Sequence, residues 1–334
     1  MRAPTILRTL PLRQLQPRAP VAVTPLPEKT RFDRKLTAEL DTLRSQGGGG
    51  EIGLAHLLDA AITTQKIALD SLVNVCYIDD VDRVFVDKYL EDNVEILDAC
   101  NYFMDKMGNI NEYVDSLRVV VHLVDSCSNN NKGSAKDLAL TRALQFLDSC
   151  QGIEKRCKEM EKGGFCLKKT FQQKLFHHET ESPVGEAMCG SKAMALMCCR
   201  LLQLGLSFDS KRGLPKIKLL MSQPRRSCCC SWMGILQELA KQAEGSAEKK
   251  RLQRKRSCWS SLLQQTVSAA TELKEQMKGK REKEMKYAVE RVKISCRELE
   301  HGVEIVEERV KSLYKSLIDV RMTLLGILSK PTLF

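Results

Sequence analysis

The sequence predicts an all-α protein, an elongated up-down helical bundle with a long C-terminal helix of coiled-coil type. Hydrophobic residues make up 43% of the 334 residues, enough to fill a core, whereas aromatic residues make up only 5%, which is lean for a β-sandwich or barrel. The 10 prolines and 19 glycines are too few to form the turns of an all-β chain of this size. Apolar residues recur at helical spacing along most of the chain.

Residues 1–30 are basic, with Arg2, Arg8, Arg13 and Arg18 and no acidic residue before Glu28. We expect a disordered tail here, because repeated prolines prevent a long helix. An organelle transit peptide is the alternative, since such peptides are rich in arginine and poor in acids, although serine is absent.

Residues 31–163 are predicted to form helical hairpins, because five apolar-periodic segments are joined by short loops. The first helices cover residues 31–45 and 51–75, and Asp79, Asp80 and Asp82 cap the third. Gly108 then suggests a turn over residues 108–112 that returns the chain as a fourth helix, residues 113–126. The fifth covers residues 135–162. The apolar stripe of the third helix is Val86, Leu90, Val94, Leu97, Met104 and Met107.

Residues 164–256 are basic and cysteine-rich and lack a strong helical pattern, so we expect a linker region with short helices. Between residues 211 and 283 there are 18 Lys and Arg against 6 Glu, which indicates contact with an anionic surface at one place. Residues 187–208 approach the length of a membrane span, but Lys192 and Arg200 interrupt them, and charges at mid-span are costly. We therefore expect no transmembrane helix there.

Residues 257–330 are predicted to form C-terminal helices that pack on the N-terminal bundle. The last helix has the strongest periodicity in the chain, with apolar residues alternating by four and three over six heptads. An intermolecular coiled coil would give the same pattern, but the chain supplies other helices for this seam to contact, which favours the bundle. The seam includes Val292, Leu299, Val306, Leu313, Leu317 and Val320.

The fourteen cysteines are interpreted as reduced thiols of an intracellular protein, because several replace apolar residues on helical faces. Phosphate-binding, dinucleotide-binding, serine-hydrolase and zinc-protease motifs are absent from the sequence. His177 and His178 lie near Cys157 and Cys166 in sequence, but their spacing is not that of a zinc finger. We predict a protein that is not an enzyme and has neither a cofactor nor a metal.

One segment suggests attachment to a membrane surface. Pro224 is followed by Arg225, Arg226 and the triplet Cys228, Cys229 and Cys230, and then by an amphipathic stretch. Acyl chains on adjacent cysteines act together with cationic residues in stable membrane binding. A buried or inert cysteine cluster is the alternative.

A second segment is a dense basic cluster. It can act as a solvated helix face, which we favour, as a patch for anionic lipid, or as a nuclear import signal. A nuclear protein associated with nucleic acid is thus the alternative function, but no specific nucleic acid is expected because no aromatic platform accompanies the cluster. The cluster consists of Lys249, Lys250, Arg251, Arg254, Lys255 and Arg256.

Residues 85–101 resemble a motif of the BYPASS family of plant proteins. In that family an aromatic residue precedes the pattern Tyr-Leu-Asp-x-Ser-Val-x-Leu-Leu-Asp-x-Cys. Phe85 stands here where the family usually has tryptophan, and Asn93 where it often has serine. The helical layout is also similar, so the resemblance spans about residues 31–330. The residues that match are Tyr89, Leu90, Val94, Leu97, Asp98 and Cys100.

The resemblance implies a non-enzymatic regulator of root and shoot development that restrains a root-derived mobile signal. Some relatives resemble partners of exocyst subunits, so we expect other proteins, or a second copy, as partners. The family supplies no catalytic residue, and Tyr89 and Asp98 are interpreted as structural. We expect an intracellular protein in the cytoplasm and at the periphery of a membrane, with the chloroplast as the alternative set by the N-terminus.

Overall fold

The computed structural model describes residues 30–46, 53–73, 75, 78–129, 133–162, 182–208, 230–252, 259–279 and 282–330. These residues form helices and no strand, which confirms the predicted all-α helical bundle. The helices are α1 (Arg31–Gln46), α2 (Leu54–Leu72), α3 (Asp80–Asn129), α4 (Gly133–Lys162), α6 (Pro183–Gly205), α7 (Ser231–Leu252), α8 (Trp259–Lys278) and α9 (Glu282–Leu328).

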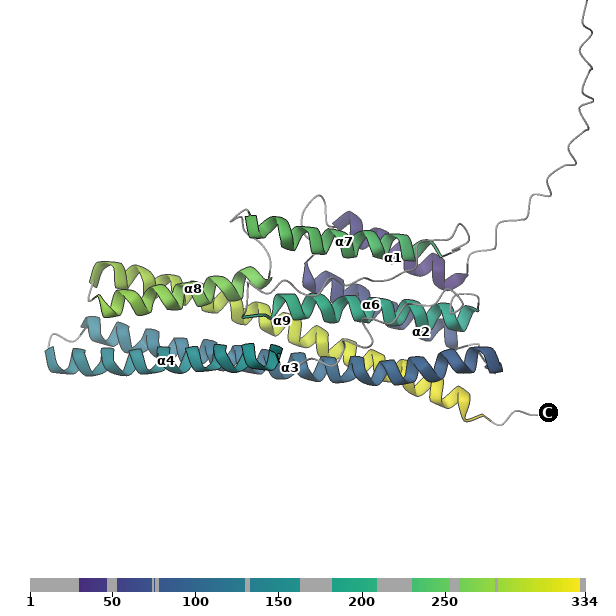
Figure 1. Cartoon of the computed structure of the whole chain (residues 1–334), viewed down its shortest axis with the longest axis horizontal. Coiled ribbons are helices and arrows are strands. Elements are labelled where there is room, and N and C mark those ends of the chain that lie inside the picture. Colours follow the sequence, from purple (N-terminus) through teal and green to yellow (C-terminus); the bar gives the residue numbers. More distant parts are fainter. Residues whose placement is uncertain are drawn as a thin grey trace, which may run out of the picture.

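The helices build two four-helix bundles placed end to end, and α3 and α9 run through both (Figure 1). The first bundle joins α2 and α6 to the N-terminal half of α3 and the C-terminal half of α9. The second joins α4 and α8 to the other halves of the same two helices. A pair formed by α1 and α7 lies over α2 and α6 as an outer layer.

The two long helices are antiparallel over their whole length. In the first bundle, Asn93 of α3 donates a hydrogen bond to the Leu317 carbonyl of α9. In the second, Lys293 of α9 lies 2.9 Å from a carboxylate oxygen of Asp125. Both helices are about 70–75 Å long at 1.5 Å per residue, so each is a spine shared by the two bundles.

The turn expected at residues 108–112 is wrong, because α3 continues from Asp80 to Asn129. Gly108 lies on the exposed side of the helix, while Met107, Ile110 and Tyr113 are fully buried. A glycine inside a helix costs only about 1 kcal/mol, and burying these neighbours offsets that cost. Val94, expected on the apolar stripe, is exposed.

The expectation of a linker with only short helices over residues 164–256 is wrong, because residues 183–205 form the 23-residue helix α6 and residues 231–252 form the 22-residue helix α7. Charged residues interrupt the apolar pattern of α6 in the sequence, but the structure buries them. Lys192 forms an ion pair with Asp92 of α3, and Glu186 and Arg200 are also almost inaccessible to solvent. Among the described helices, none combines the length and apolar character that crossing a membrane requires.

The seam of the last helix lies inside the chain's own bundle. All six seam residues named from the sequence are fully buried in α9, and α9 packs against α2, α3 and α8. The seam therefore contributes to the core of both bundles, as the bundle interpretation predicted, and an intermolecular coiled coil does not need to cover it.

A buried ion pair joins the two bundles at the middle of the molecule. The Lys106 ammonium of α3 lies 2.6 Å from Oε1 of Glu161, one residue before α4 ends, and only 1% of the Lys106 side chain is exposed. Glu161 also accepts hydrogen bonds from the Ser207 hydroxyl at 2.8 Å and the Phe208 amide at 3.3 Å, just beyond α6. The ends of α4 and α6 thus meet on one carboxylate.

Two glycines should respond in opposite ways to alanine. Gly108→Ala should raise the free energy of unfolding by about 0.5–1 kcal/mol, because the new Cβ meets nothing within 4 Å and the helix gains propensity. Gly190→Ala should lower it by about 1–3 kcal/mol, because the Cβ would lie 2.6 Å from the Phe32 ring. Urea unfolding of both variants checks this, and a destabilised Gly108→Ala would contradict a continuous α3.

Removing the buried ammonium should be far more costly than removing an exposed one. Lys106→Met leaves Glu161 buried without its cation and should lower the free energy of unfolding by about 3–5 kcal/mol. The matched control is Arg156→Met, which breaks the exposed pair with Glu112 and should cost less than about 1 kcal/mol. Equal losses in urea unfolding would show that the Lys106 pair is not structurally important.

Candidate functional site

Cys230 is the part of the predicted membrane-contact segment that the structure describes; Arg225, Arg226, Cys228 and Cys229 lie outside the described residues. Cys230 directly precedes α7 and is half-buried. The apolar residues that follow it face inward, since Trp232 and Leu236 are fully buried. The amphipathic stretch is thus used for packing on the bundle.

Three helices begin close together at this place. The Thr30 hydroxyl accepts the Asp33 amide at 2.9 Å and caps α1, and the Ser182 hydroxyl accepts the Gly185 amide at 2.8 Å and caps α6. At the start of α7, Oδ1 of Asp33 accepts the Ser231 amide at 2.6 Å. The first turn of α1 thereby caps a helix that begins about 200 residues later.

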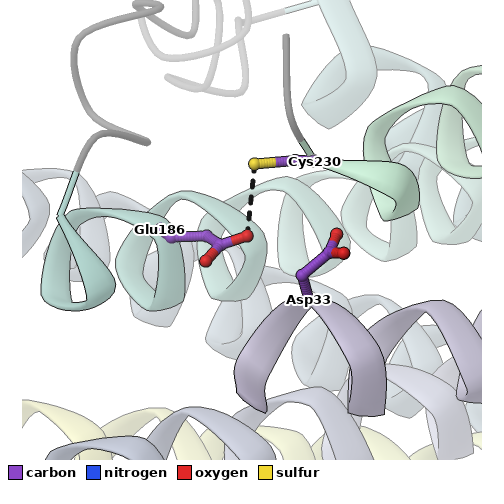
Figure 2. Close-up of side chains that lie close together, drawn as sticks. All are labelled: Asp33, Glu186 and Cys230. Carbon is purple, nitrogen blue, oxygen red and sulfur yellow. Dashed lines mark hydrogen bonds between the residues drawn. The ribbon is translucent and has the colours of Figure 1, made fainter. Parts of the chain in front are cut away.

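The side chains of Asp33, Glu186 and Cys230 form what we call the acid–thiol cluster (Figure 2). Asp33 and Glu186 lie in the first turns of α1 and α6, and each is 2% exposed. The Cys230 thiol donates a hydrogen bond of 3.1 Å to Oε1 of Glu186. Glu186 also accepts from the Thr30 hydroxyl and from Nε1 of Trp232.

The electrostatics of the cluster are set by helix ends. Among the described residues, no Lys, Arg or His side chain forms an ion pair with Asp33 or Glu186. The groups of the described residues that donate hydrogen bonds to them are neutral hydroxyl, thiol, indole and amide groups. The positive ends of α1, α6 and α7 favour negative charge there, and this field holds two carboxylates in the interior.

Sequence reasoning missed Asp33 and Glu186. The local signal was present, because each acid lies in a first helical turn behind Thr30 or Ser182, residues that favour the cap position. What the sequence could not show is that helices beginning at residues 31, 183 and 231 start side by side.

The basic cluster lies at the other end of α7. Lys249, Lys250 and Arg251 belong to its last turns, before it ends at Leu252. The backbone of these three is described but their side chains are not, and Arg254, Lys255 and Arg256 lie outside the described residues.

Tyr89, one of the residues that carry the family resemblance, holds α3 against α6. The Tyr89 hydroxyl lies 2.8 Å from Oγ of Ser191 in α6, and Ser191 in turn donates to Gln65 of α2. Asp98 stays on the exposed side of α3. A cavity of about 10 Å³ between α3 and α6, lined by Tyr89 and Lys192 among others, has room for about one water molecule. Within the motif, Tyr89 therefore contributes to the packing of α3 on α6, whereas Val94 and Asp98 lie on its exposed side.

The nine cysteines that the structure describes are thiols, and none of them forms a disulfide. Burial raises the pKa of Cys150 in α4 and of Cys296 in α9 to about 12. It also raises the pKa of Cys198. These thiols stay protonated at neutral pH and are poor nucleophiles, which is the behaviour of core residues.

Comparison of the chain with protein-family models, with curated proteins and with solved structures finds no match.

The raised thiol pKa values predict a loss of stability in alkali. The unfolded state releases the Cys150 proton near pH 9, whereas the folded state holds it until about pH 12. Stability contributed by this thiol is therefore complete below pH 9 and falls as pH rises to 12, by up to about 1.4 kcal/mol per pH unit. Urea unfolding from pH 8 to 11 should show a shallower fall for Cys150→Ala than for the wild type, and an unchanged slope would contradict the assignment.

Proposed function

We propose that this protein is a non-enzymatic adaptor of the BYPASS type, which binds other proteins at the surface of an anionic membrane and regulates root and shoot development. In this proposal it restrains a root-derived mobile signal. The resemblance over residues 85–101 supports the developmental role, and the position of α7 supports the membrane role.

The observation that carries the membrane role is that both segments predicted to contact a membrane border one outer helix. The cysteine triplet ends at the start of α7, and the basic cluster begins in its last turns. The helix is 22 residues long, about 33 Å, and lies in the outer layer with α1 (Figure 1). Acylated cysteines and a basic cluster would then act as two separate points of attachment.

The outward face of α7 is polar over its first three turns. Gly234, Glu238, Lys241 and Gln242 are exposed there, while Trp232, Leu236 and Leu239 are buried. The described part of α7 therefore has no apolar face to insert into lipid while it is docked. Acyl chains and cationic residues would supply the affinity, which matches the two-signal rule for stable anchoring.

Protein partners would bind the outer faces of the rod. Tyr287 and Ile294, one heptad apart on α9, are 67% and 54% exposed, and aromatic residues are enriched in protein interfaces. Exocyst subunits are the partners that the resemblance suggests, and a second copy of the chain is the other candidate. The seam of α9 is used inside the bundle, so self-association would use such an outer face.

Membrane flotation of the full-length protein expressed in plant cells tests the proposal. The wild type should float with membranes, and Cys228→Ser/Cys229→Ser/Cys230→Ser should lose most of its floating fraction. The matched variant Cys228→Ser/Cys229→Ser keeps Cys230 and so leaves the acid–thiol cluster intact. Loss of flotation in this double variant as well assigns the effect to acylation.

A wild type that stays entirely soluble would overturn the membrane role. Accumulation in the nucleus with retention on DNA or RNA that is lost at moderate salt would favour the alternative function, in which the basic cluster contacts nucleic acid.

A further inference from the structure

We propose that the acid–thiol cluster of Asp33, Glu186 and Cys230 is a zinc site with three protein ligands. One carboxylate oxygen of each acid and Sγ of Cys230 all lie within 4.8 Å of one another. Ligands at 2.0–2.3 Å from a tetrahedral zinc ion are roughly 3.3–3.8 Å apart. The thiol and Oε1 of Glu186, at 3.1 Å, are already near that spacing, and small side-chain rotations would bring in Asp33.

A separate observation at Asp33 supports a cation site. Oδ1 of this carboxylate accepts the amides at the start of α7, but Oδ2 is buried and has no hydrogen-bond partner. The carboxylate rises from α1 toward the start of α7, where Cys230 lies (Figure 2). A buried acceptor without a partner costs about 1–3 kcal/mol, and a cation bound to Oδ2 would remove that cost.

The proposed ligands are held by hydrogen bonds from neighbouring groups, as is usual for the ligands of a metal site. Carboxylates that bind a metal usually accept hydrogen bonds as well, which fixes their orientation. Here the Ser231 and Trp232 amides hold Asp33 through Oδ1, and the Thr30 hydroxyl holds Glu186 through Oε2. Oε1 of Glu186 accepts the Cys230 thiol, and one carboxylate oxygen of Asp33 lies within 4.8 Å of both groups.

Charge and ligand type select the metal. Two buried carboxylates without an ion-pair partner among the described residues favour a divalent cation over none. Ca²⁺ and Mg²⁺ take oxygen ligands and have little affinity for sulfur, whereas Zn²⁺ accepts both thiolate and carboxylate. On binding, the Cys230 thiol loses its proton to the solvent, the S–H hydrogen bond to Glu186 is replaced by S–Zn and O–Zn bonds, and no electrons are exchanged.

The ligands lie at the starts of three helices, with Cys230 just before α7, so the ion would tie α7 and α1 to α6 there. This inference does not depend on the proposed function. It gives Cys230 a role different from that of Cys228 and Cys229, because a zinc-bound thiolate is not available for acylation.

Metal titration of the full-length, reduced and chelator-stripped protein tests the site. Zn²⁺ is added in competition with a chromophoric chelator, and Co²⁺ serves as a second probe, because a cobalt–thiolate bond gives a charge-transfer absorption. We expect one ion per chain, the cobalt absorption, and a higher Tm with Zn²⁺. Asp33→Asn, Glu186→Gln and Cys230→Ser should each weaken Zn²⁺ binding tenfold or more, and Cys230→Ser should also remove the cobalt absorption.

Two controls separate this site from other thiols and acids. Asp98→Asn removes an exposed carboxylate of α3, and Cys228→Ser/Cys229→Ser removes the neighbouring thiols; both should bind Zn²⁺ like the wild type. Circular dichroism without metal confirms that the isosteric variants fold. The proposal is overturned by a wild type that binds no Zn²⁺ at micromolar concentration. It is equally overturned by unchanged binding in Asp33→Asn and Glu186→Gln, which would assign the metal to cysteines alone.

Discussion

Lys106 lies halfway along α3 with its side chain almost entirely out of contact with water, and its charge is balanced there by Glu161. Burial lowers the pKa of this lysine and the carboxylate opposes that effect. Because an ammonium group without a partner is so costly to bury, the pair restricts how α3 and α4 can slide along each other. The same carboxylate accepts hydrogen bonds just beyond the end of α6, so it ties a helix of each bundle to the middle of the shared helix α3.

Around this point α3 and α9 continue without interruption, while the helices that pack against them change. The Tyr113 ring contacts Phe208 edge-on, with the ring centroids 5.6 Å apart, and the amide of Gln264 in α8 donates to the Ser207 carbonyl. Helix ends from both bundles thus meet around the middle of α3. The molecule is an elongated rod because α3 and α9 run through both bundles, whereas each of the shorter helices packed against them belongs to one bundle.

The sequence predicts well those features that depend only on the periodic pattern along one face of a single helix. The heptad pattern of residues 285–327 marks buried positions of α9 because each bundle requires an apolar stripe at the same spacing. Two other features depend on the tertiary structure. Gly108 suggested a turn, but a glycine on the exposed side of a helix is tolerated when its neighbours are buried. Lys192 suggested a linker, but in the fold it forms a buried ion pair with Asp92. The acid–thiol cluster could not be predicted, because its residues come from positions 33, 186 and 230 and only tertiary structure brings them together.

The outer layer of α1 and α7 links the fold to the two proposals. Its inner face is apolar and the start of α7 is held by Asp33, so Cys230, the last residue of the cysteine triplet, lies at a fixed place on the bundle. A lipid anchor on Cys228 and Cys229 would therefore orient the rod at a membrane. A zinc ion at Cys230 would strengthen the same junction.

Hydrogen exchange across the middle of α3 tests the shared spine most directly. We would follow deuterium uptake by peptides that cover residues 104–116 in the native full-length protein. A continuous helix predicts that these amides exchange as slowly as those of residues 96–103 and 117–124, since all are hydrogen-bonded within one helix and border the core. Fast exchange confined to residues 108–112 would show a turn at Gly108 and would contradict two bundles built on shared helices.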